Sequence, residues 1–156
     1  MAMLDQNDFA ALIPELKSWN GGKGVDIETW ISCEGDHKHL IGYAQILWPD
    51  FVEHDGCIFL GRSIDEDNYR TWLAQTKGDK KRVEAVINHR HIVDLFSRSQ
   101  HDPPTQDVVL YIGRLIKEIW QTKLSHDFPG RKIRVSFPED TLKDILEYEI
   151  TFFQER

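Results

Sequence analysis

The chain has 156 residues, of which 40% are hydrophobic and 29% are charged. Its 26 acidic residues outnumber its 19 lysines and arginines and give a formal net charge of −7, which disfavours non-specific binding to nucleic acid or to an anionic membrane. The apolar runs are too short to cross a hydrocarbon core of about 30 Å. The length and composition are typical of one folded unit, and we expect a single globular domain over 1–156.

The N-terminal segment and the two cysteines bear on the cellular compartment. The first eight residues lack a basic stretch followed by an apolar core, so we predict no secretory signal and expect a cytoplasmic protein. Cys33 and Cys57 lie in apolar runs and are expected to be buried free thiols. Too few cysteines and histidines surround them for a metal site, and the sequence predicts no metal and no cofactor.

Hydrophobic periodicity and turn residues predict the order of helices and strands. Strands alternate apolar and polar residues, whereas helices repeat apolar residues every three or four positions. Residues 97–106 are rich in turn-forming residues and predict a loop. The expected ranges are a short helix over 5–17, strands over 25–33, 39–48 and 57–60, helices over 63–78, 79–96 and 105–123, and strands over 132–137 and 147–152.

This order predicts an α+β fold, with an antiparallel sheet of about five strands and helices mainly on one face. The pattern is βββ-ααα-ββ after the N-terminal helix. Lys132 and Arg134 are expected to lie opposite Glu147 and Glu149 if the last two strands pair antiparallel, because opposite charges favour that register. The helix over 105–123 carries a clean apolar stripe, which we interpret as core packing.

One segment between two predicted strands combines carboxylates with an imidazole: Asp50, Glu53, His54 and Asp55. A carboxylate beside a histidine can fix its tautomer for general-base catalysis, and both groups are ligands for divalent metals. The segment therefore predicts a small hydrolase or metal-dependent enzyme. The alternative is a solvated turn without a catalytic role.

His37 and His39 form a His-x-His pair at the start of the predicted strand over 39–48. On a strand, residues two apart point to the same face, an arrangement that can hold a metal ion. The alternative interpretation is an ordinary surface strand entry. Both stay open at this point.

The predicted helix over 79–96 contains a charged pair and two histidines. Arg90 falls inside its apolar arc, and Asp94 lies four residues further on. A buried arginine must be paired, so a structural ion pair with Asp94 is one interpretation. The other is that Arg90 binds a small anionic ligand through its two-pronged guanidinium. His89 is expected to pack toward the core and His91 to face solvent.

The N-terminal part of the chain combines aromatic residues with acids, of which Trp30 and Glu28 are the leading example. Residues 1–67 carry 13 acids against four lysines and arginines, a net charge of −9. Aromatic and acidic side chains together are typical of a protein surface that binds a basic partner. The leading hypothesis is therefore a non-catalytic protein-binding module, similar in character to an immunity protein or inhibitor; a homodimer stays open.

Overall fold

The structure is a computed structural model, and it describes residues 6–95 and 103–156. The chain falls into two compact units, Met1–Ala44 and Gln45–Arg156, which we describe separately; the single domain over 1–156 stays a prediction. Most of the expected loop over 97–106 lies outside the described residues. The α+β class is confirmed, but the helices come first in the chain and the strands form two sheets.

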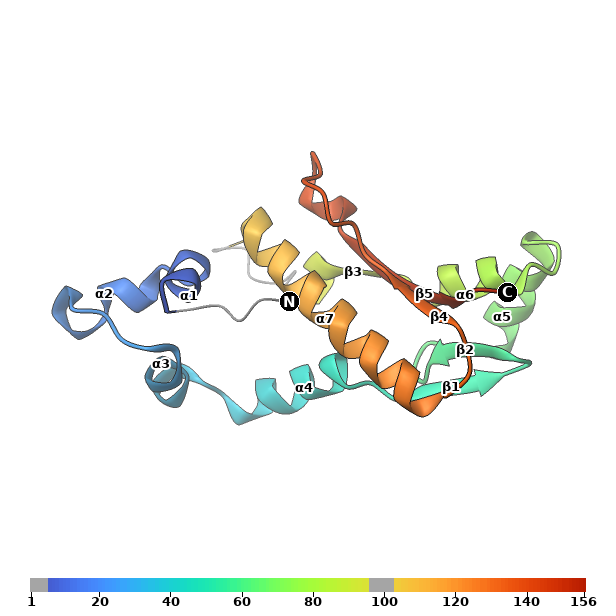
Figure 1. The fold of residues 1–156 in the computed structure, drawn as a ribbon, viewed down its shortest axis with the longest axis horizontal. Coiled ribbons are helices and arrows are strands. Elements are labelled where there is room, and N and C mark those ends of the chain that lie inside the picture. The colour runs from blue at the N-terminus through green and yellow to red at the C-terminus, as the bar shows by residue number, and fades with distance from the viewer. Residues whose placement is uncertain (1–5, 96–102) are drawn as a thin grey trace. The chain divides into compact units, whose positions relative to one another are not determined.

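Within the described residues, the regular elements of the first unit are all helices, joined by short connections (Figure 1). The strands expected over 25–33 and 39–48 are wrong, because both segments form helices. The last residues of the fourth helix already belong to the second unit. The helices are α1 (Gln6–Leu12), α2 (Glu15–Gly22), α3 (Ile27–Glu34) and α4 (His37–Leu47).

Capping explains why α3 and α4 form in place of strands. The Asp26 carboxylate accepts a hydrogen bond from the backbone N–H three residues on (2.8 Å), and the Asp36 carboxylate accepts one from the N–H two residues on (2.7 Å). Such contacts satisfy the amides at the start of a helix. Ile27, Trp30 and Ile31 also have helical spacing, so the alternation that predicted a strand was ambiguous.

The second unit begins with a hairpin of β1 (Phe51–His54) and β2 (Cys57–Leu60). The strand expected over 57–60 is confirmed, whereas β1 was predicted as a loop. Asp55 and Gly56 form the turn with φ angles of 49° and 72°, which is the left-handed geometry that a two-residue hairpin turn requires.

Two helices follow, α5 (Glu66–Gln75) and α6 (Lys80–Ile87), in the region where two were predicted. The helix over 79–96 was predicted too long. After Asn88 the chain forms β3 (Arg90–His91) and a 3-10 helix, η1 (Ile92–Leu95). The apolar residues of this segment belong to different elements that pack in two separate cores.

The second sheet has the strand order β3-β5-β4, with all neighbours antiparallel. The strands expected near the C-terminus are confirmed as β4 (Ile133–Ser136) and β5 (Glu149–Gln154). A short 3-10 helix, η2 (Ile145–Glu147), precedes β5. The expected charge ladder is wrong, because Arg134 pairs with Phe153. The register follows the buried residues that alternate along both strands.

The long helix α7 (Gln106–Asp127) covers the larger core of the second unit (Figure 1). Its predicted apolar stripe is confirmed, and its buried members include Val109, Ile116 and Trp120. β2 is buried along its whole length because Ile58 and Leu60 face this core while its other two side chains face a smaller core with α5 and α6. Among the described residues, no helix has both the length and the apolar character needed to cross a membrane.

Candidate functional site

The predicted catalytic segment forms the β1–β2 hairpin, and its turn contacts α5 and α6. The Oδ2 atom of Asp55 accepts a hydrogen bond from the Tyr69 hydroxyl (2.6 Å) and lies 3.0 Å from the Lys80 Nζ atom. Lys80 also donates to the backbone oxygen of Asp55 (2.6 Å). We refer to Asp55, Tyr69 and Lys80 as the turn cluster.

The contacts within the turn cluster keep Asp55 ionised and Tyr69 neutral around pH 7. The hydrogen bonds from the Tyr69 hydroxyl and the Lys80 ammonium lower the pKa of Asp55. Burial and the bond to Asp55 raise the pKa of Tyr69. A general acid or base works best with a pKa near the working pH. These shifts move the pKa values of both groups further from pH 7. The turn cluster is therefore suited to holding the hairpin against α5 and α6.

His54 has a different set of partners. Its Nε2 atom lies 3.1 Å from Glu66 Oε2, and its ring packs edge-on against Tyr69 with centroids 4.9 Å apart. About two-fifths of the His54 side chain is exposed (38%). The contact orients the imidazole toward α5 rather than toward the other acids of the hairpin.

Glu53 and Asp50 separate further. Glu53 Oε1 forms an ion pair with Arg131 Nη2 (2.6 Å), whereas the Asp50 side chain is exposed. The backbone oxygen of Asp50 accepts a hydrogen bond from Gly61 (2.8 Å). The four residues predicted to act together are thus close along the chain, but their described contacts do not bring them into one site.

On its inner side α6 carries a fully buried carboxylate, Glu84 (0% exposed). Its Oε1 atom accepts hydrogen bonds from the Ile58 backbone N–H (2.9 Å) and from Gln154 Nε2 (2.6 Å). Its Oε2 atom accepts one from the Gln154 backbone N–H (2.9 Å). The Arg156 guanidinium lies 3.3 Å from both oxygens and supplies the opposite charge that a buried carboxylate needs.

Asn88 lies one helical turn after Glu84 and also connects β2 with β5. Its Oδ1 atom accepts from the Leu60 backbone N–H (3.1 Å), and its Nδ2 atom donates to the Ile58 and Phe152 backbone oxygens (2.9 and 3.2 Å). We refer to Glu84 and Asn88 as the α6 bridge. Since β2 and β5 belong to different sheets, these two side chains replace the ladder hydrogen bonds that a continuous sheet would have.

Arg90 is half-buried, and its expected ion pair with Asp94 stays a prediction. Its guanidinium donates to the backbone oxygens of Ile87 (3.2 Å) and His89 and to the Ser63 hydroxyl. Burial lowers the pKa of Arg90. The Ile87 and His89 carbonyls lie at the C-terminal end of α6 and just beyond it, where a cation is favourable. Anion binding by Arg90 stays a prediction.

Trp30 and Glu28 lie on α3, half-buried and exposed respectively. Neither α3 nor α4 has a buried residue. Four large apolar side chains on these helices are strongly exposed: Ile31 (53%), Leu40 (69%), Ile41 (64%) and Tyr43 (44%). We refer to these four residues together with Glu28 and Glu34 as the α3–α4 surface.

The two cysteines differ. Cys57 is buried in the smaller core, as predicted, and burial raises the pKa of its thiol. Cys33 is exposed, contrary to expectation, because its segment is a helix without buried residues.

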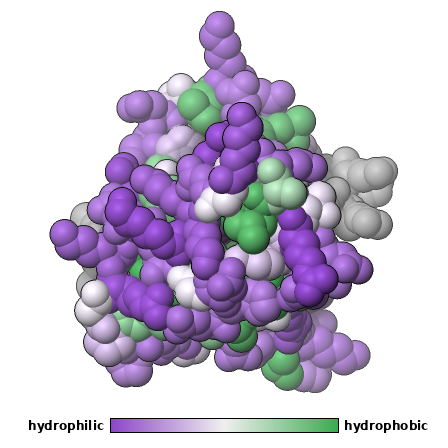
Figure 2. Space-filling view, turned by 90° about the vertical axis from the view of Figure 1, so that its right-hand side faces the viewer, coloured by the Kyte–Doolittle hydropathy of each residue, from purple (hydrophilic) through white to green (hydrophobic). Residues whose placement is uncertain are grey.

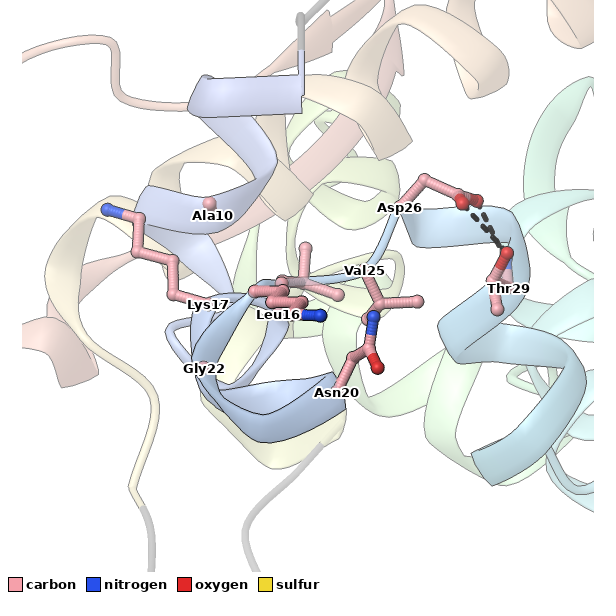
Figure 3. A pocket seen from close by; sticks show the side chains of 10 residues that line it. Ala10, Leu16, Lys17, Asn20, Gly22, Val25, Asp26 and Thr29 are labelled. Carbon is pink, nitrogen blue, oxygen red and sulfur yellow. Dashed lines mark hydrogen bonds between the residues drawn. The ribbon is translucent and has the colours of Figure 1, made fainter.

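A pocket of about 660 Å³ lies in the first unit, beside the glycine-rich end of α2 (Figure 3). The Asp26 carboxylate at its rim is engaged by the backbone N–H (2.8 Å) and the hydroxyl (2.7 Å) of Thr29. Figure 3 shows the Lys17 ammonium pointing away, at the opposite end of the pocket. Its charged groups do not converge on one point, and we assign it no role.

Sequence reasoning missed one group with metal-ligand chemistry: His89, His91 and Glu149. Its signal was present, since the two histidines have the same spacing as His37 and His39. The segment was interpreted as a helix, on which residues two apart diverge. The α6 bridge was also missed, and it left no local signal because its partners are far away in the sequence.

No protein-family model, curated protein or solved structure matches the chain.

Proposed function

We propose that this chain is a non-catalytic protein-binding module that engages a basic partner through the α3–α4 surface. One observation carries the proposal: two helices without a buried residue expose four large apolar side chains. Single exposed apolar residues are ordinary, but a group of them marks a surface that is covered in the working state. Figure 2 shows the contrasting case, a largely hydrophilic face on the side of α5, α6 and the C-terminus.

Burial of this surface is energetically favourable. Fully burying one Leu or Ile side chain contributes about 1.5–3 kcal/mol. Leu40 and Ile41 are each about two-thirds exposed, so most of that energy is still available to a partner. Tyr43 adds an aromatic side chain, a residue type enriched at binding hot spots.

The charge around the surface selects the class of partner. Residues 26–44 contain four acids and one lysine, and the hydrogen bonds from Thr29 lower the pKa of Asp26, which keeps it ionised. Acids at the rim of an interface attract basic proteins and repel anionic membranes. A second copy of the chain would bring two acidic surfaces together, which costs free energy.

An immunity protein or inhibitor of a basic enzyme fits this chemistry. The separate contacts of Asp50, Glu53, His54 and Asp55 support a role that does not depend on catalysis at the hairpin. A small hydrolase or metal-dependent enzyme that uses those residues remains the competing proposal. It requires the side chains of Glu53, His54 and Asp55 to move out of their present contacts.

Two labelled amphipathic peptides test the proposal, one built from Lys and Leu and one from Glu and Leu, with equal length and hydrophobicity. We expect the full chain to bind the Lys/Leu peptide more tightly in fluorescence anisotropy, and the affinity to fall as salt screens the acids. Leu40→Ser with Ile41→Ser should weaken binding at least about tenfold, since each tenfold step corresponds to about 1.4 kcal/mol.

The matched control is Leu146→Ser, because Leu146 is exposed to a similar degree (58%) but lies in the second unit. Its affinity should equal that of the unchanged chain. Equal binding of both peptides, or equal weakening by the control, contradicts the proposal. So does self-association in sedimentation equilibrium, or binding to phosphatidylserine vesicles, that the double substitution abolishes.

A further inference from the structure

Two strands of the second sheet bring three possible metal ligands together. His91 and Glu149 are direct cross-strand partners in the β3–β5 pair, and their side chains therefore lie on the same face of the sheet. His89 precedes His91 by two residues and shares that face. One ligand atom of each residue lies within 4.8 Å of the others.

The distances within this group match those around a tetrahedral ion. His89 Nε2 lies 3.3 Å from one Glu149 oxygen, and His91 Nε2 lies 3.6 Å from the other. Ligands about 2.1 Å from a tetrahedral zinc ion lie about 3.4 Å from one another. The two imidazole rings are 4.6 Å apart at their centroids and steeply inclined (77°), so both can direct a nitrogen to one point.

A backbone contact sets the tautomer of one ring. His91 Nδ1 lies 2.9 Å from the Leu146 backbone oxygen, and because a carbonyl oxygen only accepts, Nδ1 must carry the proton. In the neutral ring this leaves a lone pair on Nε2 that faces the Glu149 carboxylate. A cation between them removes the repulsion of the two lone pairs. A hydrogen bond from the second ring nitrogen to a carbonyl is also the usual support for a metal-binding histidine.

We propose that His89, His91 and Glu149 bind one divalent transition-metal ion of the zinc class. Imidazole nitrogens and a carboxylate oxygen suit this class, and three protein ligands leave a fourth position for water or another ligand. The side chains are between about one-third and one-half exposed (36%, 35% and 48%), so an ion can enter from solvent. The bound ion would tie the two-residue strand β3 to β5.

Zinc titration of the full, chelator-treated chain tests this directly. We expect one Zn²⁺ per chain by calorimetry and a rise in Tm, since a ligand that binds the native state stabilises it. His89→Ala with His91→Ala should abolish both effects. Glu149→Gln keeps the size of the side chain, replaces its charged oxygens with an amide and should weaken binding about 10- to 100-fold. Co²⁺ should give the intense visible absorption of a tetrahedral site.

His37→Ala with His39→Ala is the matched control, because it removes another His-x-His pair near an acid, Asp36. It should leave zinc affinity and the cobalt spectrum unchanged. Absence of zinc binding by the unchanged chain overturns the proposal, as does binding that the control removes and the His89/His91 variant retains. If the His89/His91 variant does not fold, Glu149→Gln decides: unchanged affinity overturns the proposal.

Discussion

The α6 bridge and the α3–α4 surface both depart from the usual distribution of side chains: the first buries polar groups, and the second exposes apolar ones. On α6, a carboxylate and an amide that normally face water are fully buried. On α3 and α4, large aliphatic side chains that normally lie inside a protein face outward. The buried polar atoms of the α6 bridge all have hydrogen-bond partners, since no buried side-chain nitrogen or oxygen in the described ranges lacks one.

The difference shows how an unusual side chain can be assigned to structure or to function. A buried polar group with all its partners holds the fold together, because removing it leaves those partners unsatisfied. An exposed apolar group without a protein partner contributes little to folding and is available for binding. The α6 bridge should therefore govern stability, and the α3–α4 surface should govern recognition.

The largest effect is expected at Glu84. Glu84→Ala leaves the Ile58 and Gln154 backbone N–H groups and the Arg156 guanidinium without their buried acceptor. Removing one partner of a buried charged pair costs about 3–5 kcal/mol, and urea unfolding should show this loss. The exposed acid Glu147 in η2 provides the control: Glu147→Ala should change the free energy of unfolding by no more than about 0.5 kcal/mol. Equal effects would remove the distinction between the two regions.

A smaller, pH-dependent effect is expected at the turn cluster. Because the folded-state pKa of Asp55 is lowered, this carboxylate contributes stability above its unfolded pKa of about 3.9 and loses it as the pH falls through the folded value. Tyr69→Phe removes the largest cause of that shift. The urea midpoint of the variant should lie below that of the unchanged chain at pH 7, and the gap should narrow at pH 3. A gap that stays constant with pH would mean that the Tyr69 hydroxyl stabilises the fold independently of the Asp55 charge, and would contradict this prediction.

The smallest effect on stability is expected at the α3–α4 surface. Leu40→Ser with Ile41→Ser should change the free energy of unfolding by no more than about 0.5 kcal/mol, because exposed side chains contribute little to folding. Thermal unfolding followed by circular dichroism can measure this. A loss of several kcal/mol would show that these side chains are structural and would contradict their assignment to binding.

Local sequence signals were sufficient for part of the fold. The α7 stripe and the strands β2, β4 and β5 follow from periodicity. The hairpin signal at Asp55-Gly56 was present between two apolar runs and would have identified β1. The α3 and α4 segments were assigned to strands because short apolar runs fit both periodicities, and only the capping by Asp26 and Asp36 resolves them.

The candidate sites depend on contacts that no local pattern contains. Glu84 lies 70 residues from Gln154 in the sequence, and Glu149 lies on a different strand from His89 and His91. The sequence identified candidate residues by type, but their partners are set by which strands become neighbours. For the same reason the three acids and the histidine of the β1–β2 segment looked like one site, although their side chains have separate contacts.

Amide hydrogen exchange of the full chain, with and without the Lys/Leu peptide, tests the central claim most directly. Exchange reports local opening residue by residue, so it locates the bound surface without any substitution. We expect the peptide to slow exchange in α3 and α4 and to leave β2, α6 and β5 unchanged. Slower exchange confined to the second unit, with none in α3 or α4, would contradict the account.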